Sequence, residues 1–134
     1  MTTTLYFVSE EHIGLAATAG DGHRVVELMR CLGWPVVYGD HPWEFESEEK
    51  RLAFEQVFQW ALVVLTAEKE TTEQSTWEAL AKKRLQLDEA LRPLAQQLEQ
   101  KQPWPGYWRW LIATPSDVIM TWLETENKKG AASS

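Results

Sequence analysis

Residues 60–66 read Trp60-Ala-Leu-Val-Val-Leu-Thr66, and this stretch decides the expected fold class more than any other. Its five consecutive apolar residues, 61–65, are few for a typical helix and too continuous for a strand with one face in water. Such a run is typical of a strand buried on both faces in a parallel sheet covered by helices. We therefore expect a central strand here, and replacing Val63 or Val64 by Asp should abolish folding, because either change buries an unpaired charge.

The flanking sequence alternates between expected strands and helices. Apolar runs and helical periodicity predict strands at 5–9, 34–38, 60–66 and 107–113, and helices at 24–32, 47–59, 72–100 and from 115 onward. This alternation predicts an α/β fold, a small three-layer sandwich with a four-stranded, mainly parallel sheet in the order 2-1-3-4. Such an arrangement is flavodoxin-like or TIR-like. We expect a single α/β domain over residues 1–126 and a flexible polar tail over 127–134.

Composition narrows the classes of function. The net charge of the 134 residues is −7, which argues against a nucleic-acid partner, since such proteins usually carry a basic patch. One cysteine, Cys31, excludes an intramolecular disulfide and is expected to be a buried, inert thiol. No apolar run reaches the length of a membrane span, and the first residues lack the basic region of a signal peptide. We expect a cytoplasmic protein that does not insert into membranes.

Polar residues at expected strand ends are the candidates for ligand binding. Open parallel sheets bind ligands beyond the carboxyl ends of their strands, where the strand order reverses. The residues expected at or near that point are Ser9, Glu10, Asp40, Thr66 and Glu68. The same residues would equally serve as ordinary loop ends and helix caps. Neither the spacing of His12, His23 and His41 nor the glycine pattern around residue 20 predicts a metal or cofactor site, so we expect none.

One segment resembles a known type of domain. The segment 54–68, read as a helix followed by an apolar strand that ends in Thr66, and then Ser75-Thr-Trp-Glu78 are similar to the central part of TIR-like and nucleoside-deoxyribosyltransferase-like domains. In those families a catalytic glutamate follows the tryptophan by several residues. The corresponding position here is near Ala81, and the nearest carboxylate is Glu78. The resemblance implies a nucleotide or nucleoside ligand, with Glu78 as the catalytic candidate. The alternative is a solvent-exposed glutamate that pairs with Lys82.

Aromatic residues near the last expected strand are candidates for an interaction surface. The chain holds eight tryptophans, more than a domain of this length buries easily. Alternation along a strand places successive side chains on opposite faces, so one aromatic face would be only partly covered at a sheet edge. The candidates are Trp104, Tyr107, Trp108, Arg109 and Trp110. The opposite interpretation is that neighbouring helices cover both faces.

The absence of a strong catalytic motif favours a non-enzymatic function. We expect a small acidic module that binds a protein partner, or a second copy of itself as a homodimer, through an aromatic and helical surface. The alternative is a nucleotide- or nucleoside-binding domain that cleaves a glycosidic bond. That alternative predicts thermal stabilisation by nucleotides, nucleosides or NAD.

Overall fold

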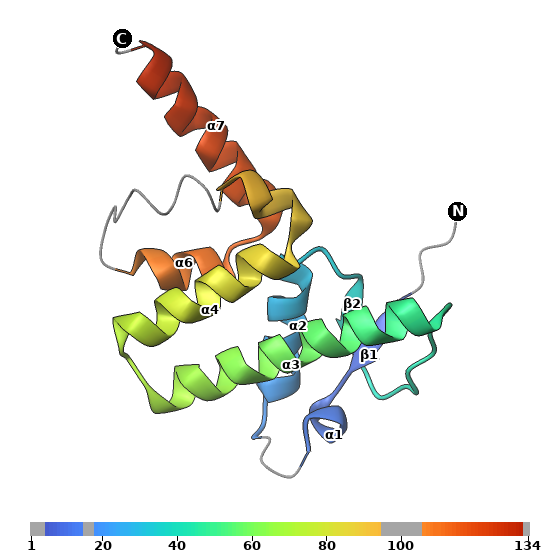
Figure 1. Ribbon diagram of the computed structural model, residues 1–134. Helices are drawn as coiled ribbons and strands as arrows, with labels where there is room; N and C mark the ends of the chain where they lie inside the picture. Colours follow the sequence, from blue (N-terminus) through green and yellow to red (C-terminus); the bar gives the residue numbers. More distant parts are fainter. Residues whose placement is uncertain (1–4, 15–17, 95–105, 133–134) are drawn as a thin grey trace.

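The computed structural model describes residues 5–14, 18–94 and 106–132. Within these ranges the chain is mainly helical and forms one two-stranded parallel sheet (Figure 1). The expected four-stranded sheet in the order 2-1-3-4 is therefore wrong, and with it the α/β sandwich of flavodoxin-like or TIR-like architecture. Two of the four expected strands are helical instead.

The two strands that do form flank the first helices. β1 (Tyr6–Val8) pairs in parallel with β2 (Val36–Tyr38), and Phe7 lies opposite Val37. Between them in the chain lie α1 (Glu10–Ile13) and α2 (Asp21–Cys31). The predictions of strands at 5–9 and 34–38 and of a helix over 24–32 are confirmed.

Side chains cap the outer edges of this small sheet. Alternation along the strands directs the carbonyl of Phe7 away from β2 and that of Val36 away from β1. The Phe7 carbonyl accepts the indole Nε1–H of Trp43 at 2.5 Å, and the Val36 carbonyl accepts Nε–H of Arg30 at 2.6 Å. These bonds occupy acceptors that a further strand would need for pairing.

The predicted central strand lies inside a long helix. α3 (Glu48–Glu70) begins after Ser47, whose hydroxyl accepts the backbone N–H of Lys50 at 3.1 Å, as expected for a helix start. The strand expected at 60–66 is wrong, because the apolar run continues the apolar stripe of this helix. Trp60 and Val64 are 0 % exposed whereas Val63 is 48 % exposed, a pattern that fits the helical period and not a strand buried on both faces.

α4 (Gln74–Leu87) forms a helical hairpin with α3, and the two helices lie side by side in Figure 1. The long helix expected over 72–100 is interrupted after Leu87, where the short 3-10 helix η1 (Glu89–Leu91) follows, and residues 92–94 are α-helical again. Asp88 accounts for the break, because its carboxylate accepts the backbone N–H of Ala90 at 3.1 Å. The last residues of the expected helix, 95–100, lie outside the described residues.

The strand expected at 107–113 is also wrong. These residues form α6 (Tyr107–Ala113), which packs against α4. Four residues of α6 are buried, and they form two pairs that are each four positions apart, which places them on one face of a helix: Tyr107 with Leu111, and Trp108 with Ile112. Aromatic β-propensity is therefore overridden by tertiary packing in this segment.

The chain ends in α7 (Ser116–Ala132), which confirms the last predicted helix. Ile119 and Leu123 are buried and fix its first half to the protein, and the helix then runs away from the other elements (Figure 1). The expected tail over 127–134 includes the last residues of this helix. A single apolar core joins the sheet to α2, α3, α4 and α6, with Trp60, Phe54 and Leu28 fully buried within it.

Candidate functional site

Ser9 and Glu10 lie where β1 ends and α1 begins. Ser9 is buried, its backbone N–H donates to Nδ1 of His12 at 3.0 Å, and its hydroxyl lies 3.3 Å from the same atom. Since Nδ1 accepts a hydrogen bond, a neutral His12 ring carries its proton on Nε2. The Ser9–His12 pair thus satisfies the start of α1, the arrangement of a capping box.

Carboxylates of the protein itself occupy the start of α2. Glu10 accepts the backbone N–H of Gly20 at 3.1 Å and the hydroxyl of Tyr38, and the Tyr38 contact is the main cause that lowers the pKa of Glu10. Asp21 accepts Nζ–H of Lys69 at 2.5 Å and the backbone N–H of Thr18 at 2.7 Å, and both contacts lower its pKa, Lys69 most. A phosphate at this helix start would meet two negative charges instead of free N–H groups.

Gly22 shows how closely α2 packs on the strand end. A Cβ atom at this position would lie 2.8 Å from the ring of Tyr38 and 3.1 Å from the backbone nitrogen of Glu10. Only glycine fits without a shift of these groups. The glycine therefore serves helix–sheet packing here, and the space in which a ligand would approach the helix is filled by the protein.

The remaining strand-end candidates are dispersed. Asp40 is exposed after β2. Glu68 lies on α3 and accepts Nε–H of Arg24 from α2 at 3.0 Å, with a second contact to the same guanidinium. Thr66, also on α3, is exposed and donates to the carbonyl of Leu62 at 3.0 Å. Ser9 and Glu10 thus lie at one end of α2, and Glu68 pairs with Arg24 on the side of the same helix. Thr66 and Asp40 lie on other surfaces.

Glu78, the catalytic candidate, lies on α4 and pairs with Lys82, with Nζ 3.3 Å from its carboxylate. The preceding Trp77 is buried, and the guanidinium of Arg109 lies 4.8 Å from the centre of its ring. This arrangement matches a helix-surface ion pair beside a cation–π contact.

The aromatic candidates are mostly covered. Tyr107 and Trp108 are 1 % and 5 % exposed, Trp110 is partly exposed, and Arg109 is exposed. Burial raises the pKa of Tyr107 to about 12. Trp104 lies outside the described residues. Because α6 is a helix and not an edge strand, Tyr107 and Trp108 face the core together.

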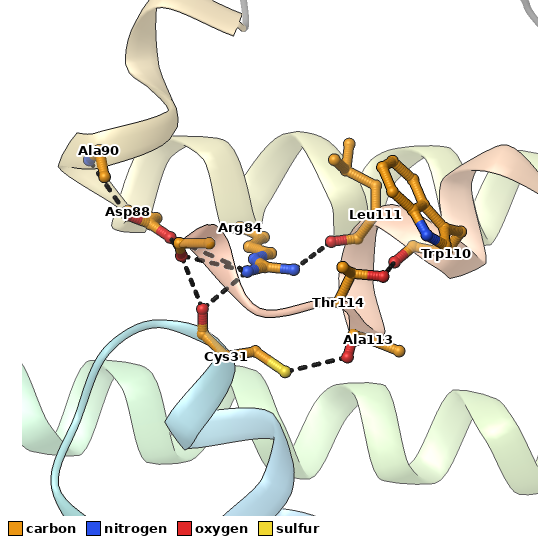
Figure 2. A network of polar contacts seen from close by, with 9 residues as sticks. Cys31, Arg84, Asp88, Ala90, Trp110, Leu111, Ala113 and Thr114 are labelled. Atoms are coloured by element: carbon orange, nitrogen blue, oxygen red, sulfur yellow. Dashed lines mark hydrogen bonds and ion pairs between the residues drawn. The ribbon is translucent and has the colours of Figure 1, made fainter. Parts of the chain in front are cut away.

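A buried polar network around Arg84 joins four helices (Figure 2). The Arg84 side chain is 0 % exposed and donates to the carbonyl of Leu111 and, at 2.7 Å, to the carbonyl of Cys31. These carbonyls lie in the last turns of α6 and α2, where a cation is favoured by the helix dipoles. Asp88 lies 3.9 Å from the same guanidinium and accepts the hydroxyl of Ser116 at the start of α7.

This network is structural in character. Burial lowers the pKa of Arg84, which remains a cation with its hydrogen bonds directed at helix ends. Burial also raises the pKa of Cys31, whose thiol donates to the carbonyl of Ala113 at 3.1 Å. A protonated, hydrogen-bonded thiol is a poor nucleophile. Sequence reasoning missed this network, although Arg84 occupies a position of the apolar stripe that includes Trp77, Ala81 and Leu91, and a charge in such a stripe is a usable signal.

An open hollow of about 480 Å³ lies where α3 ends and α4 begins. We call it the α3–α4 hollow, and its lining includes Leu62, Val63, Thr66, Ala67, Glu70 and Thr76. Val63 is nearly half exposed in it. Of the predicted ligand-binding residues only Thr66 lies here, and it was expected at the end of a strand. The lining combines apolar side chains with a few polar groups, as binding surfaces on proteins do.

Comparison with protein-family models, curated proteins and solved structures found no match to this chain. Among the described residues, no helix is both long and apolar enough to span a bilayer. His, Cys, Asp and Glu side chains of residues 5–14, 18–94 and 106–132 form no group of three suited to a metal ion.

Proposed function

We propose that this chain is a protein-interaction module without catalytic activity that binds a protein partner through the surface of α3 and α4. The observation that supports this function best is the α3–α4 hollow, in which Val63 remains 48 % exposed. Exposed apolar surface beside a concave region is typical of contact sites for other proteins. A cytoplasmic location is part of the proposal, since the one cysteine is a buried thiol that requires no oxidising compartment.

The strand-end region gives the nucleotide alternative less support. A βαβ segment is a common phosphate-binding unit, but Glu10 and Asp21 already occupy the N-terminal end of α2. Gly22 packs against the strand end and leaves no room for a ligand beside it. The α3–α4 hollow, in contrast, is open to solvent, and neither Glu10 nor Asp21 lines it.

The chain offers a matched pair of variants to test this function. Val63 and Leu52 are both exposed apolar residues of α3, 48 % and 54 % exposed, and they lie 11 residues and about 16 Å apart on one face. Val63→Lys places a long charged side chain in the hollow, whereas Leu52→Lys makes the same change outside it. Both variants should keep the far-ultraviolet circular dichroism of the native protein.

Partner capture from native extract, quantified by mass spectrometry, should then separate the two variants. Proteins that require the hollow are retained by native chain and Leu52→Lys but lost with Val63→Lys. If every captured protein binds the three chains equally, the hollow is not the interaction site and the proposal fails.

A further inference from the structure

One carboxylate lines the α3–α4 hollow, and a second follows Thr71, another lining residue, by two positions in the chain. Glu70 lines the hollow, and Glu73 lies three residues further on, at the start of α4. Neither makes an ion pair within the part of the chain that the structure describes. The nearby Lys69 does not neutralise them, because its Nζ contacts Asp21 at 2.5 Å on the side of α2. The rim of the hollow is therefore locally negative.

Glu70 occupies a position that does not favour it for folding. Glu70 is the last residue of α3, where the helix carbonyls carry partial negative charge. Glu73 holds the N-cap position of α4 without a side-chain cap hydrogen bond, although its charge suits the positive end of the helix dipole, so Glu70 is the residue that breaks a local rule. Residues that break local rules without a compensating contact often serve a function.

The charge of the rim selects the class of partner. Phosphate groups of nucleic acids and anionic membrane surfaces would be repelled, and the net charge of −7 adds to that repulsion. A cationic side chain would be attracted to Glu70 and Glu73, while Leu62 and Val63 offer apolar contact beside them. A segment with an apolar anchor next to Lys or Arg satisfies both features, as amphipathic helices do in hydrophobic grooves.

We propose that the α3–α4 hollow binds a basic amphipathic segment of a partner protein. An apolar side chain of that segment contacts Leu62, Val63 and Ala67, and its Lys or Arg residues pair with Glu70 and Glu73. This inference rests on the proposed function, because it names the chemistry of the partner at the same site.

Three synthetic helical peptides test the charge requirement. They share one leucine pattern and carry Lys, Ser or Glu at their polar positions. In titrations of the isotope-labelled chain followed by NMR, the Lys peptide should shift the amide signals of Val63, Thr66, Glu70 and Thr76, and added salt should weaken its binding. The Ser peptide should bind more weakly at the same signals, and the Glu peptide should not bind.

Charge-neutral variants give the matched control. The double variant E70Q/E73Q should weaken binding of the Lys peptide about fivefold, the size expected for two exposed ion pairs. The double variant E44Q/E49Q removes two exposed carboxylates elsewhere, and should change binding by less than about twofold. Equal weakening in both double variants, or shifts that map to residues 44–49, would show general attraction to an acidic protein and overturn the proposal.

Two further outcomes separate this inference from the function on which it rests. If the Ser and Lys peptides bind the hollow equally and E70Q/E73Q has no effect, the basic partner is refuted while docking at the hollow stands. If Val63→Lys binds the Lys peptide as tightly as native chain does, the proposed function fails as well. Sedimentation tests a second copy as the occupant: a dimer that Val63→Lys converts to a monomer would overturn the proposal of a basic partner.

Discussion

Replacing two neighbouring valines of α3 by the same residue, Asp, should give opposite results. Val64 is 0 % exposed and packs in the core, whereas Val63 is 48 % exposed. Val64→Asp forfeits the burial of a whole valine side chain, about 1.5–3 kcal/mol, and places an unpaired carboxylate among apolar groups. The total loss should reach at least about 4 kcal/mol, a large part of the stability of an ordinary domain. Val63→Asp should cost about 1 kcal/mol, because half of its surface is already in water.

Urea unfolding followed by circular dichroism measures both changes. Val63→Asp should remain folded, with its midpoint lowered by about 0.5 M, whereas Val64→Asp should be unfolded or nearly so without urea. The comparison is well controlled because chain position and substitution are almost identical. In a strand buried on both faces the two side chains would point into two apolar layers, and both variants would unfold. Equal, severe loss in both would therefore refute the helical assignment of residues 60–66.

Three further predictions follow from the buried and charged groups. Arg84→Met should lower the unfolding free energy by about 3 kcal/mol or more in urea titrations, because two helix-end carbonyls lose the guanidinium donors and the buried Asp88 loses its ion-pair partner. An unchanged value would show that the network is dispensable. The pKa of Asp21 is lowered, mainly by Lys69, so its contribution to the free energy of unfolding is present above the unfolded-state pKa of about 3.9 and is lost as pH falls through the folded-state pKa. Asp21→Asn should therefore lose less stability than native protein does below about pH 4. An equally steep loss in the variant would contradict the contact with Lys69. Burial raises the pKa of Tyr107 to about 12, so its contribution to stability is complete below about pH 10 and is lost as pH rises through about 12. Because the pKa values of Tyr6 and Tyr38 are also raised, ultraviolet titrations of native protein and of Tyr107→Phe should differ by one tyrosinate that forms near pH 12, and a difference that forms near pH 10 would show that Tyr107 is exposed.

The helices and strands whose ends are marked by capping or turn residues could be predicted from the sequence. Ser47 predicts the start of α3 and Gly33 follows the end of α2, and these two helix ends lie within about a residue of where they were expected. β1 and β2 were predictable from short runs of β-branched and aromatic residues. The errors lie where a short apolar run had to be assigned by length alone. No glycine or proline separates 47–59 from 60–66, which favours one continuous helix over a helix followed by a strand.

The candidate site was harder to predict, because it depends on the assignment of residues 60–66. The sequence pattern predicts Thr66 at the end of a strand, whereas Thr66 lines the hollow because residues 60–66 are helical. Val63 was expected to be buried, so the sequence pattern gave no reason to choose it as a contact residue. The hydrogen-bond partners of Arg84 were also beyond sequence reasoning. The sequence shows a charged residue within an apolar helical stripe, but the helix ends that accept its hydrogen bonds come from distant parts of the chain.

Site-specific photo-cross-linking tests the central claim, that the α3–α4 hollow is a protein-binding site, most directly. A photoreactive amino acid at position 63, with position 52 of the same helix as the control, would be activated in native extract and the linked peptides identified by mass spectrometry. We predict links from position 63 to a partner segment in which Lys or Arg residues flank an apolar side chain, and few or none from position 52. Links from both positions to the same protein in equal yield, or from position 52 alone, would contradict the assignment of the hollow as the binding site.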